Sequence, residues 1–337
     1  MTNFPYKWFL RDGYPEKNGL KVFSTFACGG GSSMGYKLAG YDVIGANDID
    51  PQMAKVYKEN HRPKYFYHCP IKDLLTIDLP DELFNLDILD GSPPCSTFSI
   101  AGSREKAWGK NKMFREGQAK QVLDDLFFDF IDLVARLKPK VVVAENVKGM
   151  LSGNAKGYLI EIKKRLIKLG YEVQIFCFNA ATMGVPQKRE RVFIIANRML
   201  YPKIKLEFSE TPITLKNIED NATDIIGEPL SEAYAKWWRL SYGGGFSKVH
   251  PKGSFFNTFK CQKNKVLNTI TATSGAKLTH YRYPNELSKE IIIMAGSFPC
   301  DYNFMDLPPK YLVGMSVPPV MMAQIASQIY LQWFKSL

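Results

Sequence analysis

From residue 20 onward the sequence alternates short apolar runs with amphipathic stretches of helical spacing, and few folds suit such a pattern. The apolar runs are rich in β-branched and aromatic residues, which is typical of buried strands. The predicted strands are KVFSTF (21–26), YDVIGAND (41–48), LDILD (86–90), VVVAEN (141–146), EVQIFCF (172–178) and RVFIIAN (191–197). The predicted helices are SSMGYKLAG (32–40), PQMAKVYKEN (51–60), 122–137 and 154–170. Strands and helices in alternation predict an α/β fold with a doubly wound, Rossmann-like sheet.

The alternation stops after Asn197. Residues 199–267 are rich in proline, glycine, lysine and aromatic residues and have little periodicity, which predicts a second, smaller module. Helical spacing returns at 317–334. We therefore expect a first domain at 1–198, the second module at 199–267, and a C-terminal segment, 268–337, that returns to the first domain.

The charge and the cysteine content of the chain limit the binding partners and the cellular compartment that we expect. Lysine and arginine number 44 against 33 aspartate and glutamate, and the net charge of +11 suits a polyanionic partner such as nucleic acid, although many basic proteins have no such partner. The six cysteines include no C-x-x-C pair, so we expect reduced thiols and no metal site. No run of 18 apolar residues and no secretory leader is found, so we expect a cytoplasmic protein with no membrane partner.

A glycine-rich turn follows the first predicted strand. FACGGGSSMG would let the backbone approach a ligand closely at the carboxyl end of the sheet, where α/β folds place their cofactors. The next strand ends in Asp48, and an acid at that point commonly accepts hydrogen bonds from ribose hydroxyls. Together they predict a cofactor that contains a nucleoside. The glycine spacing differs from the dinucleotide fingerprint, and a plain tight turn is the ordinary alternative.

The segment GSPPCSTFS (91–99) places Cys95 behind two rigid prolines at the end of a predicted strand. A thiol held at a strand end in a cleft is well placed to act as a nucleophile. A buried structural cysteine is the ordinary alternative and would be favoured if this segment stood alone.

Two further segments carry charges at strand ends. Glu145 ends a strand of valines, where a carboxylate is costly to bury unless it has a partner or works on a ligand. Arg189 and Arg191 alternate in PQKRERVFII, so both side chains project to one face as the strand begins. Ordinary surface charges are the alternative for the arginines.

These segments occur in one order along one predicted sheet, and in this combination the sequence resembles the DNA cytosine-5 methyltransferases. The resemblance rests on GSPPCSTFS, ENV and QKRERVF; it covers residues 20–198 and resumes near 268 with TITAT, SFPCDYNF and VGMSVPPVMMAQIASQIY. It implies a sheet of the type that binds S-adenosylmethionine, and target recognition by the module at 199–267.

The resemblance also implies the catalytic roles. Cys95 would add to C6 of the cytosine, and Glu145 would be protonated or hydrogen-bonded as the adduct forms. Arg191 would hold the cytosine O2, with Arg189 supporting the same pocket, and Asn146 would order the loop around Cys95. The cytosine must be flipped out of the duplex, and the segment from Ser96 to Asp124 is the expected closing loop.

For the cofactor, the resemblance implies S-adenosylmethionine, released as S-adenosylhomocysteine, with no metal. The implied binding residues are Phe26, Gly29, Gly31, Asp48, Ile49, Ile71, Pro93, Leu126, Ser316 and Val317. Two positions depart from the family pattern. Pro70 stands before Ile71 where an aspartate is usual, so Asp73 is a candidate substitute, and Met315 stands where asparagine is usual, which predicts weaker cofactor binding.

The expected partner is double-stranded DNA, and the expected state is a monomer in the bacterial cytosol or nucleoid. The sequence leaves open a cognate restriction endonuclease or a solitary methylase. A tRNA cytosine-5 methyltransferase is disfavoured because its Cys-Phe-Thr element is not found. An inactive DNA-binding relative is disfavoured because every catalytic position is filled, and a nicotinamide-dependent reductase would leave Cys95, Glu145 and the arginines unexplained.

Overall fold

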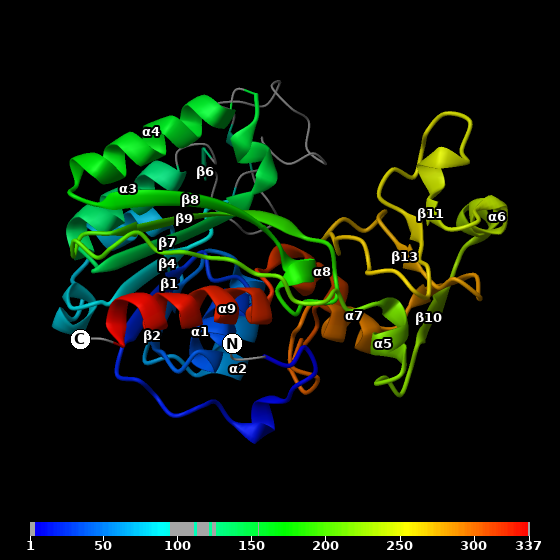
Figure 1. Cartoon of the computed structure of the whole chain (residues 1–337), viewed down its shortest axis with the longest axis horizontal. Coiled ribbons are helices and arrows are strands. Elements are labelled where there is room, and N and C mark those ends of the chain that lie inside the picture. The colour runs from blue at the N-terminus through cyan, green and yellow to red at the C-terminus, as the bar shows by residue number, and fades with distance from the viewer. Residues whose placement is uncertain (1–3, 95–110, 113–120, 123–125, 154, 336–337) are drawn as a thin grey trace. The chain divides into compact units, whose positions relative to one another are not determined.

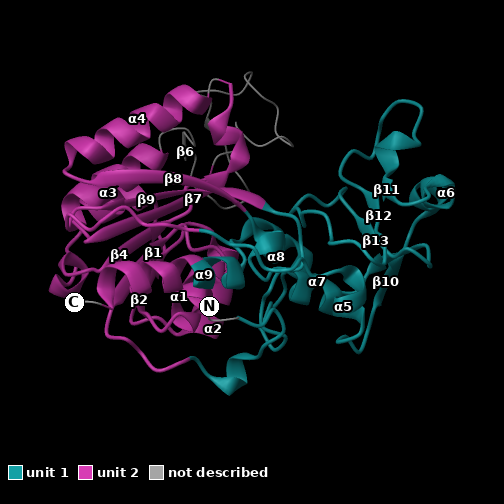
Figure 2. Ribbon diagram, in the orientation of Figure 1, with its two compact units in different colours: residues 1–14, 179–189, 207–324 teal, residues 15–178, 190–206, 325–337 magenta. Residues whose placement is uncertain are grey.

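The computed structural model describes residues 4–94, 111–112, 121–122, 126–153 and 155–335. The chain divides by its internal contacts into two compact units, which Figure 2 distinguishes by colour. Unit 1 comprises residues 1–14, 179–189 and 207–324, and unit 2 comprises residues 15–178, 190–206 and 325–337. These bounds differ from the divisions at 198 and 267, and the functions assigned to the three sequence segments stay predictions.

Unit 2 is built on a mixed seven-stranded sheet in the order β3-β2-β1-β4-β7-β9-β8 (Figure 1). Its strands are β1 (Lys21–Thr25), β2 (Asp42–Asn47), β3 (Tyr65–Tyr67), β4 (Ile88–Gly91), β7 (Val141–Val147), β8 (Glu172–Asn179) and β9 (Glu190–Asn197). Neighbours from β3 through β7 are parallel. This sheet confirms the α/β fold class.

The helices of unit 2 cover both faces of this sheet. They are α1 (Gly31–Leu38), α2 (Pro51–His61), α3 (Leu126–Leu137) and α4 (Ala155–Lys168). In Figure 1, α3 and α4 lie on one face, and α1 and α2 on the other. Because both faces are covered, the central strands are apolar throughout: residues 141–144 are all buried. The apolar stripe of α3, with Phe127, Phe130 and Val134, belongs to the same buried cluster as Val142.

Two details differ from the sequence-based prediction. Strand β9 runs antiparallel to β7, with Val141 opposite Asn197, so the sheet is mixed rather than wholly parallel. The helix predicted from residue 122 begins at Leu126. Residue 122 instead belongs to β6 (Gln121–Val122), which pairs with β5 (Asn111–Lys112) in an antiparallel ladder, so its backbone is extended.

Unit 1 contains a second sheet of five short strands, in the order β10-β14-β13-β12-β11. The strands are β10 (Ile226–Pro229), β11 (Gly244–Gly245), β12 (Phe259–Lys260), β13 (Leu278–Thr279) and β14 (Asn285–Leu287). Its helices are α5 (Leu215–Glu219), α6 (Glu232–Leu240), α7 (Lys289–Ala295) and α8 (Pro309–Met315), and α9 (Pro319–Ile329) begins in unit 1 and ends in unit 2. Strands of two to four residues are too short to give a period, so the sequence does not reveal them.

One helical run, Pro309–Phe334, reaches the length and mean hydropathy of a membrane span, with a value of 1.2. Of its apolar window, 78% is buried inside the protein, as in a core helix. The predicted helical segment at 317–334 falls in this run.

Candidate active site

The strand ends of unit 2 bring the predicted segments to one edge of the sheet. Strand order reverses direction between β1 and β4, and α/β sheets bind ligands outside the carboxyl ends of strands at such a switch point. Thr25 pairs with Gly91, and Gly91 with Ala144, so β1 and β4 end at the same level and β7 continues beyond them to Val147. The same edge of the sheet therefore carries the glycine-rich turn after β1, the start of the Pro-Pro-Cys segment after β4, and Glu145 near the end of β7.

The turn after β1, residues 26–31, is named here the cofactor turn. Its backbone is held against the end of β2: Ala27 N donates to Asn47 O at 3.0 Å, and Cys28 N donates to Asp48 Oδ2 at 2.7 Å. Gly30 has a φ of +77°, a left-handed conformation that favours glycine. Gly29 and Gly31 are buried, and Phe26 is half-buried.

Asp48 is the acid at the end of β2, and it organises the backbone around it. Its Oδ1 accepts from Asp50 N at 2.8 Å, while Oδ2 accepts from Cys28 N. Burial raises the pKa of Asp48 to about 6, and the two backbone donors act against this shift. Ile49 follows it, half-buried, with its carbonyl 3.1 Å from His68 Nε2.

Ile71 and Leu126 are buried members of one apolar cluster in unit 2. Ile71 begins a short 3₁₀ helix, Ile71–Leu75, which Arg136 of α3 secures by donating to Leu74 O and, at 2.8 Å, to Ile77 O. The structure therefore places these two predicted cofactor residues in one buried cluster, on elements that Arg136 joins.

Asn146 fixes the segment that leads to the predicted nucleophile. Its Nδ2 donates to Pro93 O at 3.0 Å, and its Oδ1 accepts from Val147 N at 2.8 Å. These bonds tie the end of β7 to the buried Pro93, two residues before Cys95. Cys95 itself lies outside the described residues, as do Ser96 and nearly all of the predicted closing loop.

Glu145 and Arg191 form an ion pair between neighbouring strands. Arg191 Nε lies 2.7 Å from Glu145 Oε1, and the two side chains are 15% and 11% exposed. Arg191 also donates through Nη1 to Glu190 O at 2.8 Å, which leaves further N–H groups of the guanidinium outside these two bonds. The pair is largely withdrawn from water, so its charges interact more strongly than a surface pair would.

Arg189 lies in unit 1 with its guanidinium committed to backbone carbonyls. It donates through Nη1 to Ile270 O at 3.0 Å, and through Nη2 to Gly314 O at 3.0 Å and Ser316 O at 2.9 Å. The residue is only 2% exposed. These bonds assign Arg189 a structural role in unit 1, and its predicted contact with substrate stays a prediction.

Ser316 and Val317 are also in unit 1 and are buried. Ser316 Oγ donates to Leu312 O at 2.9 Å, so its hydroxyl caps the end of α8. Met315, which replaces the usual asparagine, is 40% exposed. Their predicted part in cofactor binding stays a prediction.

Asp90 is a buried acid at this edge of the sheet that was not singled out from the sequence. It is 1% exposed near the end of β4, where Oδ2 accepts from Ser24 Oγ at 2.7 Å and Oδ1 accepts from the Tyr36 hydroxyl at 3.3 Å. Burial and, to a smaller extent, the charge of Glu145 raise the pKa of Asp90 to about 7, against the hydrogen bonds from Ser24 and Tyr36, which lower it. The signal was present in the sequence, since an acid within the strand LDILD is as unusual as Glu145 within VVVAEN.

No group of three or more His, Cys, Asp or Glu side chains within the described part of the chain is arranged to hold a metal ion.

Comparison with known proteins finds one family model and relatives that carry the same kind of name. The model of a family described as C-5 cytosine-specific DNA methylase matches residues 20–331. The Type II methyltransferase M.Bsp6I of Bacillus sp. (strain RFL6) is 30% identical over 343 residues, covering 92% of this chain and 98% of that one. M.NgoPII of Neisseria gonorrhoeae, another Type II methyltransferase, is 31% identical, but the match spans 60% of this chain and only 56% of that protein.

A solved structure shares the fold. It is described as a DNA modification methyltransferase encoded within an E. coli prophage, with a TM-score of 0.67 and 19% identity, covering 93% of this chain and 99% of that one.

Proposed function

This chain belongs to the C-5 cytosine-specific DNA methylase family, and from that premise we propose that it methylates C5 of cytosine in a specific site of double-stranded DNA, with S-adenosylmethionine as methyl donor. The single observation that carries this proposal is the Glu145–Arg191 pair. It lies at the sheet edge from which the segment before Cys95 departs. A buried acid and a guanidinium at that edge supply the two polar groups that a cytosine ring needs.

The residues at the cofactor turn fit S-adenosylmethionine. The Asp48 carboxyl stands at a strand end, where it can accept from ribose hydroxyls, and it holds the turn that carries the half-buried Phe26. Gly29 and Gly31 are buried and have no side chains, so only backbone is present at these two positions of the turn. When bound there, the cofactor supplies an electrophilic methyl group on a sulfonium sulfur.

Cytosine C5 is too weak a nucleophile to react with that methyl unaided. In the proposed mechanism the Cys95 thiolate bonds to C6, and the electron pair displaced from the C5–C6 double bond makes C5 nucleophilic. C5 would then take the methyl group from the sulfonium sulfur, which leaves S-adenosylhomocysteine as the product. Water would remove the C5 proton, and the electron pair of that C–H bond would re-form the C5–C6 double bond and expel the Cys95 sulfur as a thiolate. The cytosine must leave the base stack for these atoms to meet.

Glu145 and Arg191 would act on the opposite edge of the ring. Negative charge develops at N3 as the adduct forms. Glu145 would turn from Arg191 toward the ring, take up a proton from water and donate it to N3. Arg191 retains donors beyond its bonds to Glu145 and Glu190 and would direct one to the cytosine O2. Asn146 would position Cys95 through its bond to Pro93 O.

Target recognition is proposed for the 199–267 segment. It carries exposed cations for phosphates and exposed aromatic side chains for base edges. These residues are Lys236, Arg239, Tyr242, Lys248, Lys252, Phe256, Lys263 and Lys265. We further propose that the protein works as a cytosolic monomer on DNA, with a cognate restriction endonuclease that cuts the same site.

Trapping on DNA that contains 5-fluorocytosine tests the mechanism, because fluorine at C5 cannot leave as a proton does and the adduct persists. The parent with S-adenosylmethionine should give a covalent complex that survives denaturation, and Cys95→Ser should give none. Bisulfite sequencing of DNA from an expressing host reads out the site. No adduct and no methylated cytosine on any DNA would overturn the proposal, and modification of tRNA instead would redirect it to RNA.

A further inference from the structure

His61, the last residue of α2, lies buried beneath the cofactor turn. A Cβ added at Gly30 would lie within 2.8 Å of three atoms of the His61 ring, so the imidazole packs directly against the turn. The ring also stacks on Tyr57 of the same helix, with centroids 4.3 Å apart and 20° between the planes. Only a residue without a side chain fits at position 30 above this ring.

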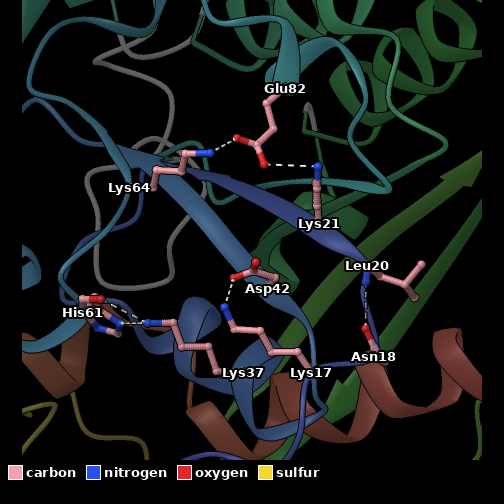
Figure 3. A network of polar contacts seen from close by, with 9 residues as sticks. All are labelled: Lys17, Asn18, Leu20, Lys21, Lys37, Asp42, His61, Lys64 and Glu82. Carbon is pink, nitrogen blue, oxygen red and sulfur yellow. Dashed lines mark hydrogen bonds and ion pairs between the residues drawn. The ribbon is translucent and has the colours of Figure 1, made fainter.

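Lys37 of α1 fixes the protonation of His61 (Figure 3). Its Nζ lies 3.5 Å from His61 Nδ1 and donates to His61 O at 3.4 Å. An ammonium has no lone pair to offer, so Nδ1 must accept and the ring proton must sit on Nε2. Burial lowers the pKa of His61 well below its usual value, and the charge of Lys37 lowers it further, so the ring is neutral.

The Nε2–H of this tautomer faces the cofactor turn. The Gly29 backbone raises the pKa of His61, which is the effect of a carbonyl oxygen near the ring, and Nε2 is the ring atom nearest to the position that a Gly30 Cβ would take. A second link joins the same two helices, because Tyr57 and Ser33 hydroxyls lie 2.8 Å apart. Helix α2 therefore holds both the turn and the first residues of α1.

We propose that His61 is a positioning residue for the cofactor: its neutral ring fills the space under Gly30 and holds the Gly29 carbonyl, and so keeps the cofactor turn in the shape that binds S-adenosylmethionine. His61 touches no reacting atom. The inference rests on the proposed function, because it assigns His61 a part in binding that cofactor.

A matched pair of variants separates the hydrogen bond from the packing. His61→Gln keeps a donor at the position of Nε2, while His61→Met has a similar length and no donor. We expect His61→Met to raise the dissociation constant for S-adenosylmethionine about tenfold, the cost of one unsatisfied buried group, and His61→Gln to restore most of the affinity. KM for the cofactor should rise in His61→Met while kcat at saturation and KM for DNA stay near the parent values. Glu59→Gln, exposed on the same helix, is the control.

A double-mutant cycle tests the contact with Gly30 itself. Gly30→Ala should weaken cofactor binding, and His61→Ala should remove the atoms that its methyl group meets. The losses should therefore not multiply, and Gly30→Ala should cost less in the His61→Ala background than in the parent. Circular dichroism and thermal unfolding establish that each variant is folded.

The outcomes are separable. Parent-like cofactor affinity in His61→Met, equal losses in the Met and Gln variants, strictly multiplicative losses in the cycle, or parallel loss of kcat, DNA binding and folding would each overturn the role of His61. If the parent binds S-adenosylmethionine but no DNA substrate is methylated, the proposed function fails while the role of His61 can still stand. If the parent binds no S-adenosylmethionine, both fall.

Discussion

Arg191 Nε lies 2.7 Å from Glu145 Oε1, and the ion pair they form joins two strands, β9 and β7, that run in opposite directions. The antiparallel register places Arg191 opposite Val147, two residues beyond Glu145, so the long guanidinium reaches back diagonally along the sheet. If β9 ran parallel to β7, as β4 does, the QKRERVF segment at its start would lie at the opposite end of the sheet. The antiparallel strand is therefore what brings the two predicted catalytic charges together.

Breaking this pair should impair catalysis more than binding. Glu145→Gln and Arg191→Met should each lower kcat about 10²- to 10⁴-fold, the range for losing a group that moves a proton or stabilises charge. The double variant should lose much less than the product of the two factors, because each side chain alone leaves the other without its partner. Single-turnover methyl transfer at saturating cofactor and DNA measures these rates.

A second ion pair, between the residue that follows β7 and the first residue of β9, is the control. Lys148 Nζ lies 2.7 Å from Glu190 Oε1, but both side chains are about half exposed, at 53% and 47%. Glu190→Gln should change stability by less than about 1 kcal/mol and kcat by less than about twofold. Equal effects at the exposed and the buried pair would argue against a catalytic role for Glu145.

The raised pKa of Asp48 predicts that cofactor binding depends on pH. Its pKa is raised to about 6, mainly by burial, so the carboxyl gains a proton as the pH falls through 6. If ribose hydroxyls donate to the ionised form, the affinity for S-adenosylmethionine should be constant above pH 7 and fall about tenfold per unit below pH 6. Calorimetric titration between pH 5 and 8 follows this.

Two variants check that assignment. Asp48→Asn should bind the cofactor about tenfold more weakly at pH 7.5, because its amide can accept only part of what the carboxylate accepts from Cys28 N and Asp50 N, and its affinity should not change with pH. Asp50→Asn should bind the cofactor as the parent does at pH 7.5, since asparagine caps a helix as well as aspartate does. Its fall in affinity should begin at a lower pH, because the Asp50 charge helps to raise the pKa of Asp48. A parent whose affinity does not change between pH 5 and 8 would remove Asp48 from the binding site.

Asp90 makes a prediction about stability. Its pKa is about 7 in the folded chain against 3.8 for an unperturbed aspartate, so between these values the folded state holds a proton that the unfolded state has lost. Its contribution must therefore lower the free energy of unfolding as the pH rises from about 4 to about 7. Asp90→Asn, which cannot ionise, should be more stable relative to the parent at pH 8 than at pH 5. Urea unfolding at both pH values measures the difference, and a constant difference would count against a raised pKa.

The sequence predicted the framework of unit 2 because its strands and helices are long enough to show their periods. Residues 141–144 form an unbroken apolar run, and α2 begins with an aspartate cap and a proline, both of which are common at helix starts. This framework also predicted that Asp48 and Glu145 lie at the carboxyl edge of the same sheet, because each stands at the end of a predicted strand. The individual roles came from the resemblance, since a lone acid or cysteine at a strand end has ordinary alternatives.

The features that could not be predicted from the sequence are contacts between residues that lie far apart along the chain. The carbonyls that Arg189 binds lie 81 to 127 residues away, so the sequence places Arg189 beside Arg191 without revealing that the two side chains have different environments. The short strands of unit 1 have no period to read. His61 showed no signal either, because its importance comes from the missing side chain of Gly30 above it.

Arg189 gives the last prediction, which concerns stability rather than catalysis. Arg189→Met should lower the free energy of unfolding by about 3 kcal/mol or more, because it leaves the carbonyls of Ile270, Gly314 and Ser316 buried without their charged donor. Arg189→Lys should recover part of this, since an ammonium donates from a single point and cannot span all three carbonyls. Lys188→Met, exposed and adjacent, should change stability by no more than about 0.5 kcal/mol. Urea denaturation of the three variants decides between the roles: if Arg189→Met unfolds like the parent but loses DNA binding, Arg189 contacts substrate, and the structural role is wrong.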